Sequence, residues 1–172
     1  MLKSGVIAIA VALTLMLIYI WIRFEWQFSL GAILALFHDV LVTLGLFSLL
    51  GLEINLSIIA AVLTIVGYSM NDTVVIFDRV RENLRKYSDI NIYDLTNISI
   101  NETLSRTLIT SITTLLALLS IFFFGGEILK GFSLAMIFGV IFGTYSSIYI
   151  ANTVLVRLRV SQKTVLREDE SN

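Results

Sequence analysis

Five long apolar runs constrain what this chain can fold into. Each run holds roughly 20 residues, which is enough to cross the hydrocarbon core of a bilayer as an α-helix. The runs cover residues 5–22, 28–50, 57–77, 103–124 and 132–156. Because 57% of the residues are apolar and only 15% are charged, one soluble domain is excluded. We therefore predict an all-α, polytopic membrane bundle of five transmembrane helices over residues 1–160, with a cytoplasmic tail over 161–172.

The basic residues predict how the bundle is oriented. Lysine and arginine are enriched on the cytoplasmic side of membrane proteins. Lys3 and Lys130 flank one set of span ends, whereas nine basic residues flank the other set. These nine are Arg23, Arg79, Arg81, Arg85, Lys86, Arg157, Arg159, Lys163 and Arg167. We therefore expect an external N-terminus and a cytoplasmic C-terminus, an arrangement that suggests a missing upstream span.

The stretch GYSMNDTVVIFDRVREN, residues 67–83, places Asn71 and Asp72 side by side in an apolar helix. Asp72 lies six residues before Asp78, the first charge of the following loop. That spacing corresponds to about 9 Å along a helix. An ionised side chain at this depth is costly and is usually buried beside a partner or water. Asp72 is therefore the principal candidate for a functional group.

A second charge is predicted at the same depth. Ser99 and Glu102 have the spacing of a capping box, which predicts that the fourth span begins near Ile100. Arg106 then lies about six residues inside the helix, again about 9 Å from its end. We predict that Arg106 pairs with Asp72 across the bundle.

The polar surroundings of this pair leave several readings open. Both charged side chains can extend to the interface, or the pair can be a purely structural bridge. Alternatively, the neighbouring hydroxyls and Asn71 line a hydrated path, unless the hydroxyls simply bond their own backbone. The polar residues on the fourth span are Thr103, Arg106, Thr107, Thr110, Thr113 and Thr114, and those on the third are Thr64, Gly67, Tyr68 and Asn71. Asn71 and Thr110 are secondary candidates.

His38 and Asp39 form another polar interruption, in the second span. Asp39 lies about eleven residues from Phe28, or roughly 16 Å into its helix, near the bilayer centre. Its role is either a structural hydrogen bond between helices or proton handling. His38 titrates near neutrality when unperturbed, but a histidine beside an acid is often only its neighbour. Both residues are secondary candidates.

The last span carries small residues at strict intervals of four, which let another helix approach closely. They are Gly131, Ala135, Gly139, Gly143, Ser147 and Ala151. Gly139 and Gly143 form a GxxxG element, which we interpret as a packing site within the bundle or against a partner.

Other classes of function find little support in the sequence. The chain has no cysteine and one histidine, so we predict no metal site and no cofactor. HExxH, GxSxG and a paired-aspartate protease arrangement are all missing, so we predict that the chain is not an enzyme. A net charge of −1 offers no general case for nucleic-acid binding.

Several blocks in order resemble the SecF branch of the SecD/SecF family, within the resistance-nodulation-division superfamily. They are ALFHDVLVTLG (35–45), FSLLGLEINLSIIAAVLTIVGYS (47–69), GYSMNDTVVIFDRVREN (67–83) and INETLSRTLITSITTLLALL (100–119). The resemblance covers residues 4–160. Asn71-Asp72-Thr73 is similar to the SecF sequence, because the SecD branch typically has an Asp-Ala-Asn type sequence there.

The resemblance implies a subunit of bacterial protein export in the inner membrane. Such a subunit works with SecD beside the SecYEG channel and uses the proton motive force to promote translocation of preproteins, with Asp72 and Arg106 as the proton-coupling residues. Family members ordinarily have a further first span and a periplasmic domain, so we expect this chain to lack both and to begin in the periplasm. Half of a small-molecule exporter and a structural assembly subunit without a proton role remain alternatives.

Overall fold

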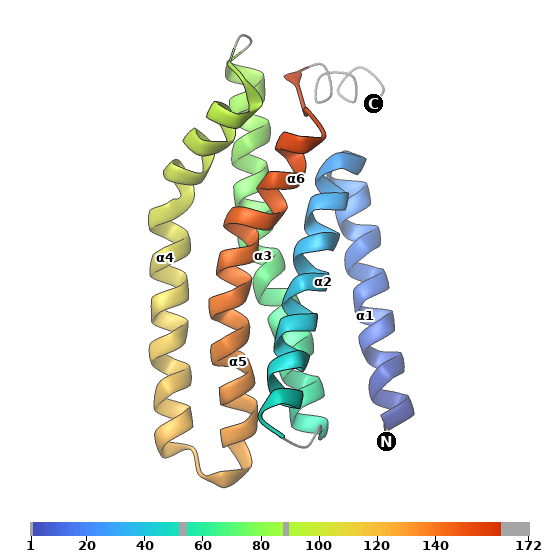
Figure 1. Ribbon diagram of the computed structural model, residues 1–172, viewed down its shortest axis with the longest axis vertical. Coiled ribbons are helices and arrows are strands. Elements are labelled where there is room, and N and C mark those ends of the chain that lie inside the picture. The colour runs from blue at the N-terminus through green and yellow to red at the C-terminus, as the bar shows by residue number, and fades with distance from the viewer. Residues whose placement is uncertain (1, 52–54, 88–89, 163–172) are drawn as a thin grey trace.

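The computed structural model describes residues 2–51, 55–87 and 90–162, and within these ranges it is a bundle of long helices without strands (Figure 1). The elements are α1 (Leu2–Arg23), α2 (Trp26–Leu49), α3 (Leu56–Lys86), α4 (Ile92–Phe124), α5 (Glu127–Tyr145), the π-helical turn η1 (Ser146–Ile150) and α6 (Ala151–Arg157). In these ranges, four helices are long and apolar enough to span a membrane, and a shorter apolar segment of α1 makes a fifth. The five-span, all-α prediction is confirmed.

Polar caps and a glycine set several helix ends. The side chain of Asn55 accepts a hydrogen bond from the backbone N–H of Ile58 at 3.1 Å, which caps the start of α3. Asn91 caps α4 in the same way, through the N–H of Tyr93 at 3.2 Å. Gly126 joins α4 to α5 with a φ of +78°, a left-handed conformation that favours glycine. These local signals fix the starts of α3 and α4 and the turn from α4 into α5.

The helices α3 and α4 are too long to lie wholly within a bilayer. They hold 31 and 33 residues, or roughly 46 and 50 Å, against a hydrocarbon core of about 30 Å. The α3–α4 connection lies at the same end of the bundle as the α1–α2 turn and the end of α6 (Figure 1). We call this end the basic end, because most of the arginines lie there.

The predicted start of the fourth helix near Ile100 is wrong. The helix begins at Ile92, so the capping-box pattern falls well inside α4. The Ser99 hydroxyl donates to the carbonyl of Leu95 at 2.9 Å instead of capping an N-terminus. Glu102 accepts hydrogen bonds from side chains of α3. Ser99 and Glu102, whose spacing resembles a capping box, therefore contact side chains of α3 instead of capping a helix. Of the predicted tail over 161–172, residues 163–172 lie outside the described ranges.

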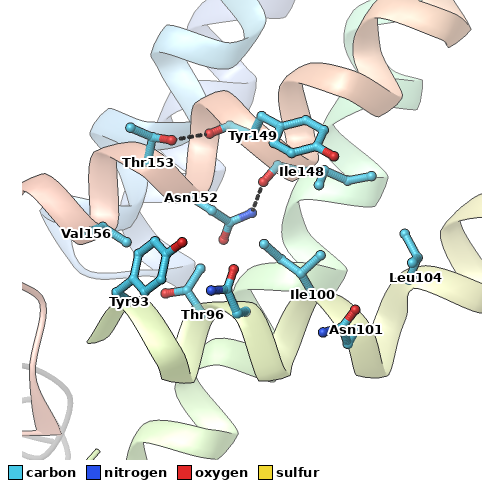
Figure 2. A pocket seen from close by; sticks show the side chains of 11 residues that line it. Tyr93, Thr96, Ile100, Asn101, Leu104, Ile148, Tyr149, Asn152, Thr153 and Val156 are labelled. Atoms are coloured by element: carbon cyan, nitrogen blue, oxygen red, sulfur yellow. Dashed lines mark hydrogen bonds between the residues drawn. The ribbon is translucent and has the colours of Figure 1, made fainter. Parts of the chain in front are cut away.

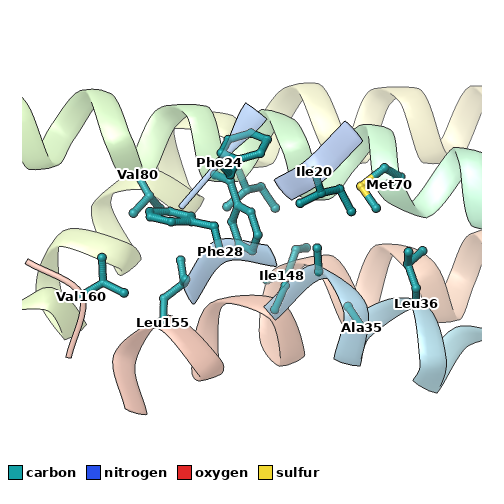
Figure 3. Close-up of a cluster of buried hydrophobic side chains, with 14 of the residues drawn as sticks. Ile20, Phe24, Phe28, Ala35, Leu36, Met70, Val80, Ile148, Leu155 and Val160 are labelled. Atoms are coloured by element: carbon teal, nitrogen blue, oxygen red, sulfur yellow. The ribbon is translucent and has the colours of Figure 1, made fainter. Parts of the chain in front are cut away.

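Two apolar clusters form the core, one toward each end of the bundle. The cluster at the basic end centres on Phe24, Phe28 and Phe77, whose ring centroids lie 5.2–6.1 Å apart (Figure 3 shows Phe24 and Phe28 in this cluster). The other cluster includes Phe47 and Ile65. Helix α3 contributes to both clusters and contacts all four other long helices. The buried polar side chains described next lie between the clusters.

Candidate functional site

Asp39 is the centre of a buried polar layer that joins α2, α3 and η1. Its side chain is fully buried. The Oδ2 atom accepts hydrogen bonds from the hydroxyls of Ser69, at 2.5 Å, and Ser146, at 2.8 Å. These contacts join residues 30 and 107 positions away in the sequence. The structural role predicted for Asp39 as one of two alternatives therefore has specific partners, and proton handling stays a prediction.

His38 provides the third side-chain contact of Asp39. Its Nδ1 atom lies 3.0 Å from Oδ1 of Asp39, and its side chain is partly exposed. The imidazole ring also packs near Tyr145, at a centroid separation of 6.4 Å. Imidazole and carboxylate can each carry a proton, so the proton shared in this contact can belong to His38 or to Asp39.

A second set of hydroxyls extends the layer along α3 and η1. The hydroxyl oxygens of Thr73 and Ser147 lie 2.9 Å apart, and each lies 3.1 Å from the carbonyl oxygen of Ser69. Asn152, one turn beyond, donates from Nδ2 to the carbonyls of Ser147, at 2.8 Å, and Ile148, at 3.0 Å. A π-helical turn disturbs the usual hydrogen-bond ladder, and such turns are frequent at functional sites. Here the side chain of Asn152 satisfies two of its carbonyls.

Asp72 does not take part in the hydrogen bonds of Ser69 and Thr73, although it lies only about 60° around α3 from Ser69. Its side chain is buried, with 4% of the residue surface exposed, and Oδ2 has no hydrogen-bond partner within residues 2–51, 55–87 and 90–162. Arg106 is exposed on α4, and its charge acts on the Asp72 carboxylate through space. Within the described ranges, no hydrogen bond or ion pair joins the two side chains. Their pairing therefore stays a prediction that requires the guanidinium to turn toward α3.

The hydroxyl-rich face predicted on α4 is divided. Of its predicted members only Thr103 and Thr107 are buried, and they continue a row at intervals of four with Ser99 and Ser111, two buried serines outside the predicted face. The Ser111 hydroxyl lies 2.7 Å from that of Thr144 on α5, and Tyr68 on α3 donates to it at 3.4 Å. Thr107, next to Arg106, has a buried hydroxyl without a partner. This inward row, rather than the whole predicted stripe, flanks Arg106 along α4.

The two secondary candidates near the charged pair do not join it. Thr110 is partly buried and hydrogen-bonds the carbonyls of Arg106 and Thr107 on its own helix, which is the inert alternative for such residues. Asn71 is exposed, because it points about 100° around the helix from its buried neighbour Asp72. In the part of the chain that the structure describes, neither side chain is hydrogen-bonded to Asp72.

Gly139 and Gly143 lie where α5 approaches α3 and α2 most closely. A Cβ atom added to Gly139 would lie 2.2 Å from Cγ1 of Ile65. At Gly143 it would lie 3.1 Å from Cβ of Ser69 and 3.6 Å from Oδ2 of Asp39. The absence of side chains at these positions therefore lets α5 close one wall of the polar layer.

At the basic end, ionic contacts join the extensions of α3 and α4. Arg79 donates from Nε to Glu102 at 2.7 Å and from Nη1 to Glu82 at 2.5 Å. Asn83 donates to Glu102 at 2.7 Å and to the hydroxyl of Ser99 at 2.9 Å. The hydrogen bonds from Arg79 and then Asn83 lower the pKa of Glu102 below its ordinary value of 4.5. Glu102 and Glu82 in turn raise the pKa of Arg79.

Acidification is expected to loosen this end of the bundle. Because the pKa of Glu102 is depressed in the folded state, its contribution to stability is present above 4.5 and is lost as the pH falls through the folded-state pKa. After correction for intrinsic rates, hydrogen–deuterium exchange at the start of α4 should rise in this window. In the Glu102→Gln variant this rise should be absent, whereas Glu127→Gln at the opposite end should retain it. An unchanged rise in Glu102→Gln would assign the pH dependence to another group.

Sequence reasoning missed most partners of Asp39. Ser69 and Ser146, which donate to Asp39, carry no signal in the sequence, and the neighbouring Ser147 stands out there only as a small residue. Isolated serines and threonines in an apolar span usually bond their own backbone, so they give no signal of their own. The available signal was the depth of Asp39, because a carboxylate near the bilayer centre needs donors from other helices.

The fold and these side chains define a multi-pass α-helical membrane protein that keeps carboxylates in its core, an arrangement typical of transport proteins. A family model described as the C-terminal region of the protein export membrane proteins SecD and SecF matches residues 1–161. The chain belongs to this SecD/SecF family, which confirms the resemblance of its motifs.

Relatives with known names agree with this assignment. The protein translocase subunit SecF of Rhodothermus marinus is 60% identical over 144 residues, which cover 80% of this chain and 47% of the relative. The SecF subunit of Cereibacter sphaeroides is 51% identical over 162 residues, which cover 94% of this chain and 50% of the relative. The chain thus spans about half the length of the curated relatives it matches.

Solved structures show the same arrangement of helices. A crystal structure of SecDF from Thermus thermophilus, described as a translocon-associated membrane protein, matches with a TM-score of 0.88 and 48% identity. The match covers 91% of this chain and 22% of that chain. A crystal structure of SecDF in a super-membrane-facing form matches with a TM-score of 0.85 and 46% identity, over 97% of this chain and 22% of that chain.

Proposed function

We propose that this chain is the membrane bundle of a SecF-type subunit that couples the proton motive force to protein export across the bacterial inner membrane. Family membership over residues 1–161 supports the export role, since the named relatives are translocase subunits. In this role the chain is a transport component and not an enzyme.

The observation that carries the proton-coupling part of the proposal is the environment of Asp72. Its carboxylate is buried in the bundle with one oxygen unpaired, and it is within range of the Arg106 charge. An ionised carboxylate that lacks donors is costly in an apolar interior, whereas a protonated one is much less so. Asp72 is therefore a group whose charge can change the packing of the bundle.

The proposed topology places the basic end in the cytoplasm. The end of α1, which carries Arg23, lies there with the end of α3 and the end of α6, whereas the start of α5, which carries Lys130, lies at the opposite end (Figure 1). Residues 1–160 then form the transmembrane bundle, the N-terminus faces the periplasm, and residues 161–172 form a cytoplasmic tail. SecD is the proposed partner subunit, with the SecYEG channel and the exported preprotein as further partners.

The proposed mechanism alternates two charge states of one site. A proton arriving from the periplasm neutralises Asp72 and weakens its attraction to Arg106, which remains charged. Release of the proton to the cytoplasm restores the attraction and draws α3 and α4 together. The membrane potential supplies about 2.3 kcal/mol for each charge moved across 100 mV, which is enough to bias two packings of similar energy.

Asp72→Asn is expected to abolish the acceleration of export by the proton motive force. The substitution keeps the size of the side chain but removes the titratable group. Export of a preprotein into membrane vesicles is measured with and without an ionophore, after co-purification has shown that the subunit is assembled.

Asp78→Asn is the matched control, since Asp78 lies six residues further along α3 and pairs with Arg23 at the surface at 3.0 Å. It should retain the acceleration. If Asp72→Asn also retains it at the normal rate, the coupling role is wrong, and a structural role in assembly is favoured.

A further inference from the structure

A groove of about 450 Å³ lies between α4 and the rod formed by η1 and α6, at the basic end (Figure 2). Its lining is uncharged and mixed, with apolar side chains from both walls and a set of polar groups among them. It includes the side-chain amides of Asn97, Asn101 and Asn152 and the aromatic side chains of Tyr93 and Tyr149. A groove of this volume accommodates several water molecules, each of which needs two to four polar partners.

Asn152 gives this groove an unsatisfied acceptor. Only 2% of the residue surface is exposed, and Nδ2 is engaged by the carbonyls of Ser147 and Ile148. Its Oδ1 atom is buried and has no hydrogen-bond partner among the described residues. Figure 2 shows the side chain pointing from α6 toward Tyr93 and Thr96 of α4. Buried acceptors of this kind are normally satisfied by protein or ordered water, so a donor belongs in the groove.

We propose that this groove is a hydrated vestibule whose innermost water donates to Oδ1 of Asn152. The lining hydroxyls of Thr96 and Thr153 already donate to backbone carbonyls, so they remain available to water as acceptors. The amides of Asn97 and Asn101 supply donors for further waters. Asn152 is the positioning residue that holds this water against the inner wall of the groove.

The vestibule brings solution close to the buried polar layer. Asn152 binds the carbonyl of Ser147, and the Ser147 hydroxyl contacts Thr73 and the carbonyl of Ser69. The groove therefore ends one side chain away from the layer around Asp39. This inference goes beyond proton coupling at Asp72 and holds whether or not that group titrates during export.

Single cysteines provide the test, because the chain contains none. Ile148→Cys places a thiol in the groove, where the native residue is 9% exposed. Ile109→Cys places one on the outer face of α4, where the native residue is 60% exposed. A small, water-soluble, cationic methanethiosulfonate reagent is added to native membranes from each side. We expect Ile148→Cys to react at least about tenfold faster, because the reactive thiolate forms only in contact with water.

Asn152→Leu tests the positioning residue within the Ile148→Cys background. Leucine fills a similar volume but removes the acceptor, so the labelling rate at Ile148→Cys should fall by about tenfold. The control is Asn101→Cys, at the mouth of the groove. Adding Asn152→Leu should change its labelling rate by less than about twofold, and such a result shows that the helices still pack.

Three outcomes would overturn the proposal. Labelling of Ile148→Cys no faster than Ile109→Cys means that the groove is dry. Reaction of Ile148→Cys with a lipid-soluble maleimide alone means that a lipid chain fills the groove. An unchanged rate in Asn152→Leu means that Asn152 does not hold the water. If that variant fails to insert, the first comparison still decides. None of these readouts involves export, so their failure is separate from failure of the coupling proposal.

Discussion

Gly139→Ala is expected to lower the free energy of unfolding by about 3 kcal/mol, because its methyl group has no space. The added Cβ atom would lie 2.2 Å from Cγ1, 2.3 Å from Cδ1 and 2.9 Å from Cγ2 of Ile65. Ile65 is itself buried and β-branched, so a change of rotamer cannot move all three atoms away. Helices α3 and α5 must separate instead. Unfolding of the purified chain by heat or denaturing detergent measures the effect.

The other glycines of the same helix provide graded controls. Gly131→Ala meets nothing within 4 Å and should be neutral or slightly stabilising. Gly143→Ala meets Cβ of Ser69 at 3.1 Å and should have an intermediate effect. Ile65→Ala should restore much of the stability of Gly139→Ala, because it removes the atoms that clash. Equal effects of the three alanine substitutions would contradict this account of the packing.

Asp39→Leu is expected to cost about 2–3 kcal/mol of the free energy of unfolding. The substitution leaves the buried hydroxyl of Ser69 without its acceptor, and it removes the partner of His38. Ser146 loses less, because its hydroxyl also lies 3.1 Å from the carbonyl of Gly143. The same unfolding measurement applies.

Asp39→Asn separates the two roles open to this residue. Its amide oxygen can accept from both serines while the amide nitrogen donates to an unprotonated Nδ1 of His38, so the loss should stay below about 1 kcal/mol. If this stable variant exports normally, the role of Asp39 is structural. If it loses acceleration by the proton motive force, Asp39 handles protons as well. A loss of stability as large as that of Asp39→Leu would contradict the hydrogen-bond account and would indicate a required negative charge.

Much of the fold is predictable because spans are specified by length and apolarity alone. Residues 28–50 and 57–77, for example, fall within or at the edges of α2 and α3. The start of α4 is not predictable in this way, because the spacing of Ser99 and Glu102 also suits two residues that face Asn83 on another helix. Spacing identifies neighbours along one helix, but it does not show whether their partners are backbone amides or side chains of α3.

The depth of each site residue in the membrane can be predicted from the sequence, but the direction in which its side chain points around the helix axis cannot. Counting along the chain places Asp39, Asp72 and Arg106 within their spans. Whether two such side chains meet depends on the rotation of each helix, which is set by packing at distant positions such as Gly139. The structure therefore surrounds Asp39 with hydroxyls from helices far along the chain, whereas no described residue hydrogen-bonds to Oδ2 of Asp72.

The π-helical turn η1 changes the direction in which side chains point along the continuous helical segment made of α5, η1 and α6. Since an α-helix turns about 100° per residue, residues four apart drift by about 40°, and the four steps from Ala135 to Ala151 would accumulate about 160°. A regular helix would thus carry one end of the row to the opposite face. All five members, Ala135, Gly139, Gly143, Ser147 and Ala151, are nevertheless buried. The wider turn takes up an extra residue and rotates the following segment back, so one row of small side chains stays aimed at the bundle axis over its whole length.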